Sequence, residues 1–351
     1  MKKAERYIAR HTLIPIIAIW AGLTVLVSLF TLLAELGRLR MHYQYLQAIM
    51  HVVMTMPALA LQILPVCCLV GTVAGLGILL NHNELMVIRT SGLSRTRICL
   101  AVIKPVVILI IGSMLLSEFI IPKLQYAAEM QRTTARLRDS QQIAKGVWWR
   151  NQNDYMHFNA IMNNRLNGVQ IFSFNNQNQL TKTTHAEYAI KDGRKWILKN
   201  VSTIDYLPNE TKKTTKEAEL WNIKLNTQLL QIAMTVPEYL SIRDLFTYIQ
   251  YMKTQHAKTD GYRLSLYDKL LYPLTIISLL LTGISFIFGP LRSATTGSRI
   301  FAGITISILF MLLQKISGPA SLVFGFSPVL AALLPIIITT SLSIVLLRRV
   351  H

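Results

Sequence analysis

The hydrophobic and polar residues of this chain are arranged in long blocks. Six long apolar runs are present, and a polar stretch from 123 to 262 separates the third run from the fourth. The runs cover Leu13–Leu33, Met54–Leu80, Ile98–Pro122, Leu270–Phe288, Ile300–Ile316 and Phe326–Leu347. A helix rises about 1.5 Å per residue, so about 20 residues cross a hydrocarbon core of roughly 30 Å. The pattern predicts a polytopic α-helical membrane protein with six transmembrane helices and one inserted domain.

The polar stretch has its own pattern. Between Gly146 and Leu225, short alternating segments rich in aromatic and β-branched residues are separated by Asn, Gly and Asp. Such segments are typical of strands in a sandwich or open barrel. A polar helix from Leu124 to Arg138 is expected to continue the third span, and an amphipathic helix from Pro237 to Lys253 leads back to the membrane. We therefore divide the chain into 1–138, 139–236 and 237–351, with the β domain in the middle.

The net charge of +19 follows largely from the ends of the apolar runs. Basic residues gather at alternate ends of the runs, namely Lys2, Lys3, Arg6, Arg10, Arg89, Arg95, Arg97, Arg292, Arg299, Arg348 and Arg349. Cytoplasmic flanks of membrane spans carry such an excess of Lys and Arg. The pattern predicts that both termini are cytoplasmic and that the inserted domain lies on the outer side. It accounts for the charge without nucleic acid as a partner.

Chemical motifs are few. The chain contains no Gly-x-x-x-x-Gly-Lys-[Ser/Thr] phosphate loop, and its eight His residues lack metal-ligand spacing. Cys67, Cys68 and Cys99 fall in or beside predicted spans, where packing is their expected role. We expect no catalytic residue, metal or cofactor in this chain. A membrane enzyme would need a polar cluster at one depth of the membrane, and the sequence does not contain one.

Two glycines in the second run, Gly71 and Gly75, have the small-xxx-small spacing that lets membrane helices pack closely. The close contact can lie within the chain or between subunits. We favour a contact within the chain.

The loop between the second and third runs is the sharpest local feature. Asn81 or Asn83 can cap a short helix, and Glu84 then lies in its first turn. Gly92 fits the end of this helix, and Ser94 can cap the next span. The prediction is a cytoplasmic helix from about 81 to 91 that exposes Leu85, Met86 and Ile88. An exposed apolar face needs either a protein partner or the membrane interface.

Three charged residues follow the first run on its outward side: Glu35, Arg38 and Arg40. Basic residues there run against the trend that places positive charge inside. They either anchor the helix by snorkelling or pair with an anionic headgroup.

Several segments, taken in order, resemble one known family over essentially the whole chain. They are Arg6-Tyr-Ile8, Gly75-Leu-Gly77, Glu84-Leu85, Ser91-Gly92, Gly146-Val-Trp148, Ser285-Phe-Ile-Phe-Gly-Pro-Leu-Arg-Ser293, Gly318-Pro319 and Ala332-Leu-Leu-Pro335. The family is that of the lipopolysaccharide export permeases, LptF/LptG (YjgP/YjgQ). The segment after the fourth run resembles the LptG branch rather than the LptF branch.

This resemblance implies a non-catalytic subunit of an ABC-type transporter in the inner membrane of Gram-negative bacteria. Members of the family extract lipopolysaccharide from the outer leaflet for delivery to the outer membrane. The implied partners are the paralogous permease LptF, a dimer of the ATPase LptB, which binds ATP and Mg, and LptC. The implied form of the inserted domain is a periplasmic β-jellyroll.

The resemblance also implies roles for particular residues. The short helix becomes a coupling helix that inserts into the ATPase, with Glu84 as its key acid beside Leu85, Met86, Ile88 and Arg89. Some members have a lysine in the first span where this chain has Thr31, so Arg38 is the better candidate for lipid phosphate, beside Glu35 and Arg40. An apolar lateral gate is implied at Leu26, Phe30, Phe301, Ile304, Ile308 and Met311. Simple lipid-facing packing explains the spacing of the gate residues equally well.

A rival interpretation is a mechanical transmission protein without a path for lipid. Such a protein would function unchanged without Arg38.

Overall fold

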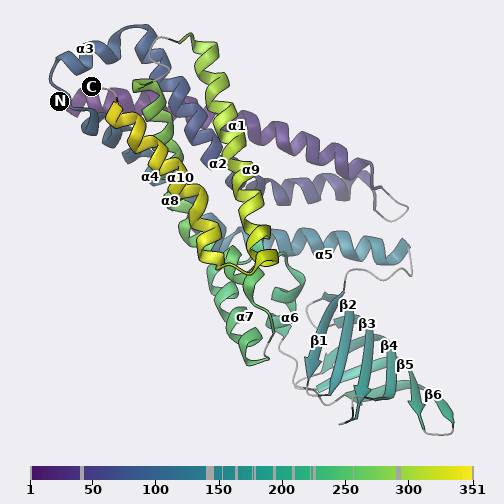
Figure 1. The fold of residues 1–351 in the computed structure, drawn as a ribbon. Coiled ribbons are helices and arrows are strands. Elements are labelled where there is room, and N and C mark those ends of the chain that lie inside the picture. Colours follow the sequence, from purple (N-terminus) through teal and green to yellow (C-terminus); the bar gives the residue numbers. More distant parts are fainter. Residues whose placement is uncertain are drawn as a thin grey trace. The chain divides into compact units, whose positions relative to one another are not determined.

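The computed structural model describes residues 2–39, 43–139, 146–151, 153–162, 165–175, 177, 179–192, 195–207, 210–221, 223, 227–255, 257–289 and 294–349. Six helices in this part of the chain are long and apolar enough to cross a membrane. They are α1 (Lys2–Leu36), α2 (Tyr45–Asn81), α4 (Arg95–Phe119), α8 (Asp260–Phe288), α9 (Thr296–Phe324) and α10 (Pro328–Arg349) (Figure 1). The six-helix prediction is confirmed. Each helix extends beyond its apolar run at one end or both.

The chain forms two compact units. The helical unit comprises Met1–Leu33, Thr55–Lys123 and Pro237–His351, and the sheet unit comprises Ala34–Met54 and Leu124–Val236. The helices α1 and α2 contribute to both units. The division at 138 and 236 stays a prediction.

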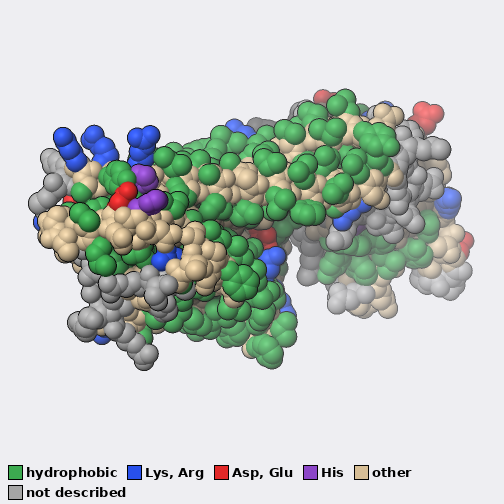
Figure 2. Space-filling model, turned by 90° about the horizontal axis from the view of Figure 1, so that it is seen from above, with side chains coloured by type: hydrophobic (Ala, Val, Ile, Leu, Met, Phe, Trp, Pro, Cys, Tyr) green, Lys and Arg blue, Asp and Glu red, His purple; other side chains and the backbone are tan. Residues whose placement is uncertain are grey.

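The core of the helical unit is built from α1, α2, α4, α8 and α9. Buried aliphatic residues from these helices, among them Ile16, Leu69, Val102 and Leu279, form one cluster. Burying such side chains against one another is what gives the unit a single packed interior. Figure 2 shows one face of the surface. Hydrophobic side chains cover much of the helices in view, and Lys and Arg side chains gather at one end.

The helices α1 and α2 approach closely at two glycines. A Cβ atom on Gly71 would lie 2.5 Å from the Cα of Ile16, and one on Gly75 would lie 2.5 Å from the carbonyl oxygen of His11. Both neighbours are backbone atoms, which cannot rotate away. The preference for a contact within the chain is confirmed.

Buried hydroxyl groups join α8 to α10. The side chains of Thr282 and Ser343 share a hydrogen bond of 2.8 Å, and the Ser285 hydroxyl donates to the Ser343 carbonyl oxygen at 3.1 Å. The Thr339 hydroxyl donates to Ser278 Oγ at 3.2 Å. Lipid tails are as apolar as a helix surface, so hydrogen bonds of this kind help to select which membrane helices pair.

The connecting segment before α8 consists of a short 3-10 turn, η1 (Pro237–Tyr239), followed by α7 (Ile242–Thr254). The single helix expected from Pro237 to Lys253 is therefore interrupted, because Ser241 adopts an extended conformation and caps α7. Glu118, at the end of α4, accepts hydrogen bonds from the backbone N–H groups of Ile242 at 2.8 Å and Arg243 at 3.3 Å. A carboxylate at a helix N-terminus is favourable for both hydrogen bonding and the helix dipole.

The sheet unit contains one six-stranded antiparallel sheet with the order β1-β2-β3-β4-β5-β6. Its strands are β1 (Val147–Asn151), β2 (Asp154–Met162), β3 (Arg165–Phe174), β4 (Leu180–Asp192), β5 (Lys195–Tyr206) and β6 (Thr211–Trp221). The inserted β domain is confirmed, as a meander whose strands pair in chain order. Two helices accompany it, α5 (Ile121–Asp139) and α6 (Thr227–Met234), and α6 was not predicted. The expected continuation of the third span is a separate helix, since α4 ends at Phe119.

A line of unusual residues crosses the sheet. Gly168 in β3 and Asn200 in β5 have positive φ angles of 61° and 54°. The flanking pairs Val169–Ala186 and Ala186–Val201 place both residues in one row, with Glu187 between them. The alternation of buried and exposed residues changes phase at this row. The buried residues on either side of it are three positions apart rather than two, namely Leu166 and Val169 in β3, and Leu198 and Val201 in β5. The row therefore reverses which side chains face inward.

We expect Gly75→Ala to lower the midpoint of thermal unfolding of the purified chain. The added methyl group has no space between two backbones, and overpacking of this kind costs about 1–3 kcal/mol. Gly22→Ala is the matched control, because nothing lies within 4 Å of its Cβ position. Equal midpoints for the two variants would show that α1 and α2 separate without cost.

Candidate functional site

The loop after α2 forms a helix, α3 (Glu84–Thr90), that is shorter than the segment 81–91 predicted for it. Asn81 is the last residue of α2 and does not cap α3. Asn83 instead takes a left-handed conformation with φ of 57°, and its carbonyl oxygen accepts the N–H groups of Met86 and Val87. The other two expectations are confirmed. Gly92 follows the helix with φ of 93°, and Ser94 caps α4 by accepting from the Arg97 N–H.

Glu84 is held by the first helix. The Tyr7 hydroxyl of α1 donates a hydrogen bond of 2.8 Å to Glu84 Oε2, and the Tyr7 ring lies 4.2 Å from the His11 ring, measured between centroids. The sequence did not reveal this contact, because 77 positions separate the two residues. The carboxylate that begins α3 is therefore oriented by α1.

The exposed face of α3 differs from the one predicted. Leu85 was expected to be exposed, but it is 1% exposed and belongs to the core of the helical unit. Ile88 is half-buried and packs against the same core. Met86 and Val87 are the exposed apolar residues, and the side chain of Arg89 lies outside the described part. The correction has a simple cause, since one side of a short helix that lies on a bundle must cover that bundle.

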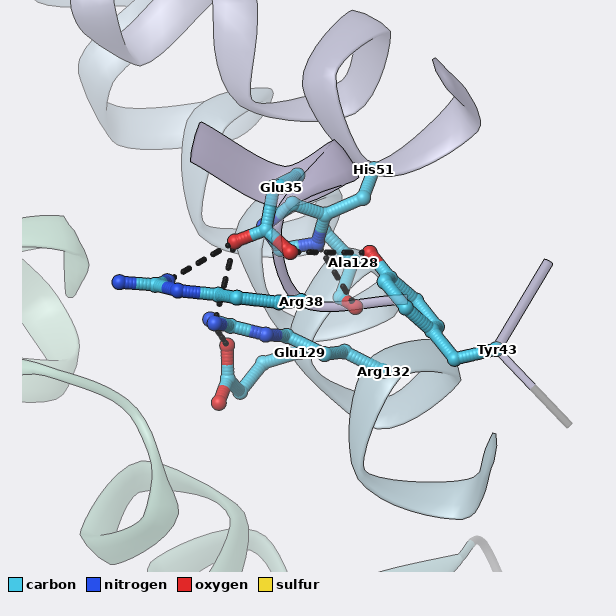
Figure 3. Close-up of polar contacts among 7 residues, drawn as sticks. All are labelled: Glu35, Arg38, Tyr43, His51, Ala128, Glu129 and Arg132. Carbon is cyan, nitrogen blue, oxygen red and sulfur yellow. Dashed lines mark hydrogen bonds and ion pairs between the residues drawn. The ribbon is translucent and has the colours of Figure 1, made fainter. Parts of the chain in front are cut away.

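A buried carboxylate organises the helix ends of the sheet unit (Figure 3). Glu35 Oε1 lies 3.1 Å from Nη1 of Arg38 and 3.0 Å from Nη2 of Arg132, which belongs to α5. The Tyr43 hydroxyl donates to Glu35 Oε2 at 3.2 Å. Arg132 also lies 3.9 Å from the exposed Glu129. One acid thus connects the end of α1, the segment before α2, and α5.

The residues of this cluster differ in exposure. The side chain of Glu35 is 5% exposed, that of Arg132 is 17% exposed, and that of Arg38 is 55% exposed. The Nε atom of Arg132 is buried and makes no hydrogen bond within the described part of the chain. Two guanidinium groups share one buried carboxylate. Arg38 is consequently the cation that faces solvent, and Glu35 lies beneath it.

The other predicted lipid-binding residues have different positions. The Thr31 hydroxyl donates to the Val27 carbonyl oxygen at 2.8 Å, so its own helix satisfies it. Arg40 lies outside the described residues. Arg132 was missed, because its contact with Glu35 depends on how α5 packs. Tyr43 was missed, because no regular spacing relates a residue of the segment after α1 to Glu35.

The predicted gate residues lie on the surfaces of α1 and α9. Five of them are exposed, namely Leu26, Phe30, Phe301, Ile304 and Ile308. Met311 is half-buried. Exposed apolar side chains on a membrane helix can contact lipid or a partner helix equally well. Among the described residues, no group of His, Cys, Asp or Glu could hold a metal ion.

Comparison with known proteins gives one consistent result. A family model described as lipopolysaccharide export system permease LptF/LptG matches residues 6–349. The lipopolysaccharide export system permease protein LptG of Escherichia coli K12 is 29% identical over 327 residues, which cover 89% of this chain and 91% of that protein. The protein of the same description from Haemophilus influenzae Rd is 30% identical over 339 residues, covering 94% of each chain. The matches extend across both compact units.

We expect Glu35→Gln to lower the midpoint of thermal unfolding of the purified chain. The change removes the closer of the two acids beside the largely buried Arg132, since Glu129 lies 3.9 Å away, and breaking a buried pair in this way costs about 3 kcal/mol. Glu129→Gln is the matched control, because its side chain is 52% exposed and surface pairs contribute little. If both variants unfold at the same temperature, the buried carboxylate does not stabilise the sheet unit.

Proposed function

This chain belongs to the lipopolysaccharide export permease family LptF/LptG, and from that membership we propose that it is a transmembrane subunit of an ATP-driven lipopolysaccharide transporter. In this proposal the chain itself is not an enzyme. It pairs with the paralogous permease LptF, with a dimer of the ATPase LptB and with LptC. ATP and Mg are bound by the ATPase, and the chain needs no cofactor. The observation that carries the proposal is the match over residues 6–349, which includes both the membrane helices and the inserted sheet.

We further propose an orientation in the bacterial inner membrane. Both termini and α3 face the cytoplasm, and the sheet unit lies in the periplasm. The distribution of basic residues supports this orientation. The start of α1, the end of α10 and α3 also lie at one end of the helical unit, as expected if all three face the same compartment (Figure 1).

In the proposed mechanism, α3 is the element that contacts the ATPase. Glu84 supplies its charge, and Met86 and Val87 supply an apolar surface for a partner. Arg89 is proposed to contribute a positive charge to the same contact. Leu85 and Ile88 act from beneath, because they attach α3 to the core and so transmit its displacement. The alternative, in which α3 lies on lipid, would require no particular acid at its start.

We expect Glu84→Ala to reduce ATP-dependent lipid release by the reconstituted complex about tenfold, the equivalent of about 1.4 kcal/mol. Tyr7→Phe removes the hydrogen bond to Glu84 and should give a smaller loss in the same direction. Glu5→Ala is the control, since Glu5 is an acid near the same end of the helical unit and pairs only at 3.7 Å with Lys104. Normal ATPase stimulation and lipid release by the Glu84 variant would exclude the coupling role.

We propose that Arg38 binds a phosphate group of lipopolysaccharide. Its side chain is 55% exposed, and the contact with Glu35 in the described part of the chain uses Nη1. A planar guanidinium suits bidentate contact with phosphate oxygens. Arg40 is proposed as a second basic group. The Thr31 hydroxyl donates to the Val27 carbonyl oxygen and is therefore not proposed to donate to phosphate. The proposed path for the acyl chains consists of the exposed Leu26, Phe30, Phe301, Ile304 and Ile308 of α1 and α9, together with the half-buried Met311.

We expect Arg38→Glu to reduce crosslinking of lipopolysaccharide to the assembled complex about tenfold, because a charge-assisted contact is replaced by repulsion. Arg38→Lys should give an intermediate yield, since it keeps the charge and loses the bidentate geometry. Arg10→Glu is the control, as an exposed arginine at the opposite end of α1. Unchanged crosslinking in an intact complex would favour the transmission protein without a lipid path.

A further inference from the structure

A buried arginine lies where α9 begins. Arg299 is 3% exposed and occupies the first turn of α9, which Thr295 caps. Its basic character and position predicted a residue flanking the membrane, yet its side chain is directed into the helical unit. The Nη1 atom donates hydrogen bonds to the Gly77 carbonyl oxygen at 3.0 Å and to Asn81 Oδ1 at 2.6 Å. Arg299 therefore binds the C-terminal turn of α2.

The contact is well matched on both sides. The last carbonyl groups of a helix carry partial negative charge, which favours a cation. A Cβ atom on Gly77 would lie 3.4 Å from Arg299 Cδ, an ordinary van der Waals distance, so the arginine stem lies directly against α2 at this position. Asn81 completes the connection, because its Nδ2 atom donates to Thr296 Oγ1 at 2.5 Å. We call these four residues, Gly77, Asn81, Thr296 and Arg299, the α2–α9 joint.

The α2–α9 joint lies between α3 and the exposed face of α9. Asn81 is the last residue of α2, and α3 begins at Glu84. On the other side, Phe301 and Ile304 follow Arg299 within about two turns of the same helix. A helix is stiff over this distance, so a shift of α3 that moves the end of α2 also displaces the exposed face of α9.

We propose that Arg299 is a positioning residue that transmits the displacement of α3 to α9. The inference rests on the proposed function, in which α3 contacts the ATPase and α9 borders the lipid path. A purely structural role would make Arg299 necessary for folding alone. The transmitting role predicts a different result. Without Arg299 the complex should still assemble and hydrolyse ATP, but each ATP hydrolysed should release less lipid.

The first measurement concerns geometry and needs no partner. Nitroxide labels are placed at the exposed residues Thr90 and Ser298 of the full-length chain in detergent, and their distance distribution is recorded by pulsed electron paramagnetic resonance. We expect a narrow distribution with Arg299, a clearly broader one with Arg299→Ala, and partial narrowing with Arg299→Lys. Arg10→Ala is the control, as an exposed arginine at the same end of the unit. A distribution unchanged by Arg299→Ala overturns the proposal.

The second measurement concerns coupling. The chain is reconstituted with the paralogous permease and the ATPase, and lipopolysaccharide released per ATP hydrolysed is compared among the same variants. We expect Arg299→Ala to lower this ratio about fivefold while complex assembly and ATPase rate stay near those of the unaltered chain. Asn81→Ala removes one acceptor and should lower the ratio less. It also provides the test if the Arg299→Ala complex does not assemble.

The two measurements separate this inference from the proposed function. If the unaltered complex releases no lipid, the proposed function fails, and the distance measurement still decides whether Arg299 holds α9 to α2. If the unaltered complex releases lipid and the ratio is the same for Arg299→Ala, or for Asn81→Ala when that variant substitutes for it, the transmitting role is overturned. A ratio that falls for Arg299→Ala and recovers in part for Arg299→Lys supports it.

Discussion

The absence of water from the hydrocarbon core is the constraint on which the rest of this structure depends. Backbone polar groups in that region need partners within the protein, so the spans are helices, and many of their hydroxyl groups bond to carbonyl oxygens. The buried Ser28 Oγ is an exception, with no partner in the described part of the chain. Thr12, Thr72 and Ser307, all fully buried, donate to the carbonyl four residues earlier. Some hydroxyl groups that bond to their own helix also contact a neighbouring one, as Thr282 and Thr339 do between α8 and α10. The hydroxyl groups that reach across to another helix therefore identify helices that are in contact.

Acidic residues outside the polar middle of the chain follow the same logic at the helix ends. Glu84 accepts from Tyr7, Glu35 holds two arginines and a tyrosine, and Glu118 caps α7. In each case a carboxylate on one element is satisfied by groups from another. The Glu35 side chain is 5% exposed, and a buried ion pair of this kind adds little net stability as a whole, although removing one partner is costly. These acids therefore fix how neighbouring elements contact one another. Glu35 does so beside the exposed Arg38, and Glu84 does so beside the exposed Met86 and Val87.

Periodicity and length were enough to predict six spans, the inserted strands and the short helix after the second span. Gly92 and Ser94 were also readable, because end signals of helices are local. The burial of Leu85 was not readable, since it depends on how α3 lies against the bundle. The contacts Glu35–Arg132 and Arg299–Asn81 join residues far apart in the chain, and no spacing rule connects them. The shift of burial phase at Gly168 and Asn200 also escaped prediction, because a glycine or asparagine in a strand signals only local freedom of the backbone.

The hydroxyl groups between α8 and α10 have a consequence for how the protein is made. Ser278, Thr282 and Ser285 each donate to a carbonyl oxygen of α8 itself, at 3.0, 2.8 and 2.7 Å. During synthesis α8 leaves the ribosome well before α10, and its hydroxyl groups can hydrogen-bond within α8 while it lies in lipid. Ser343 and Thr339 of α10 then add further hydrogen bonds, and no hydroxyl group of the three α8 residues lacks a partner before that. The hydroxyl groups of α8 are therefore bonded before α10 is made, and the pairing of the two helices adds hydrogen bonds to those already present.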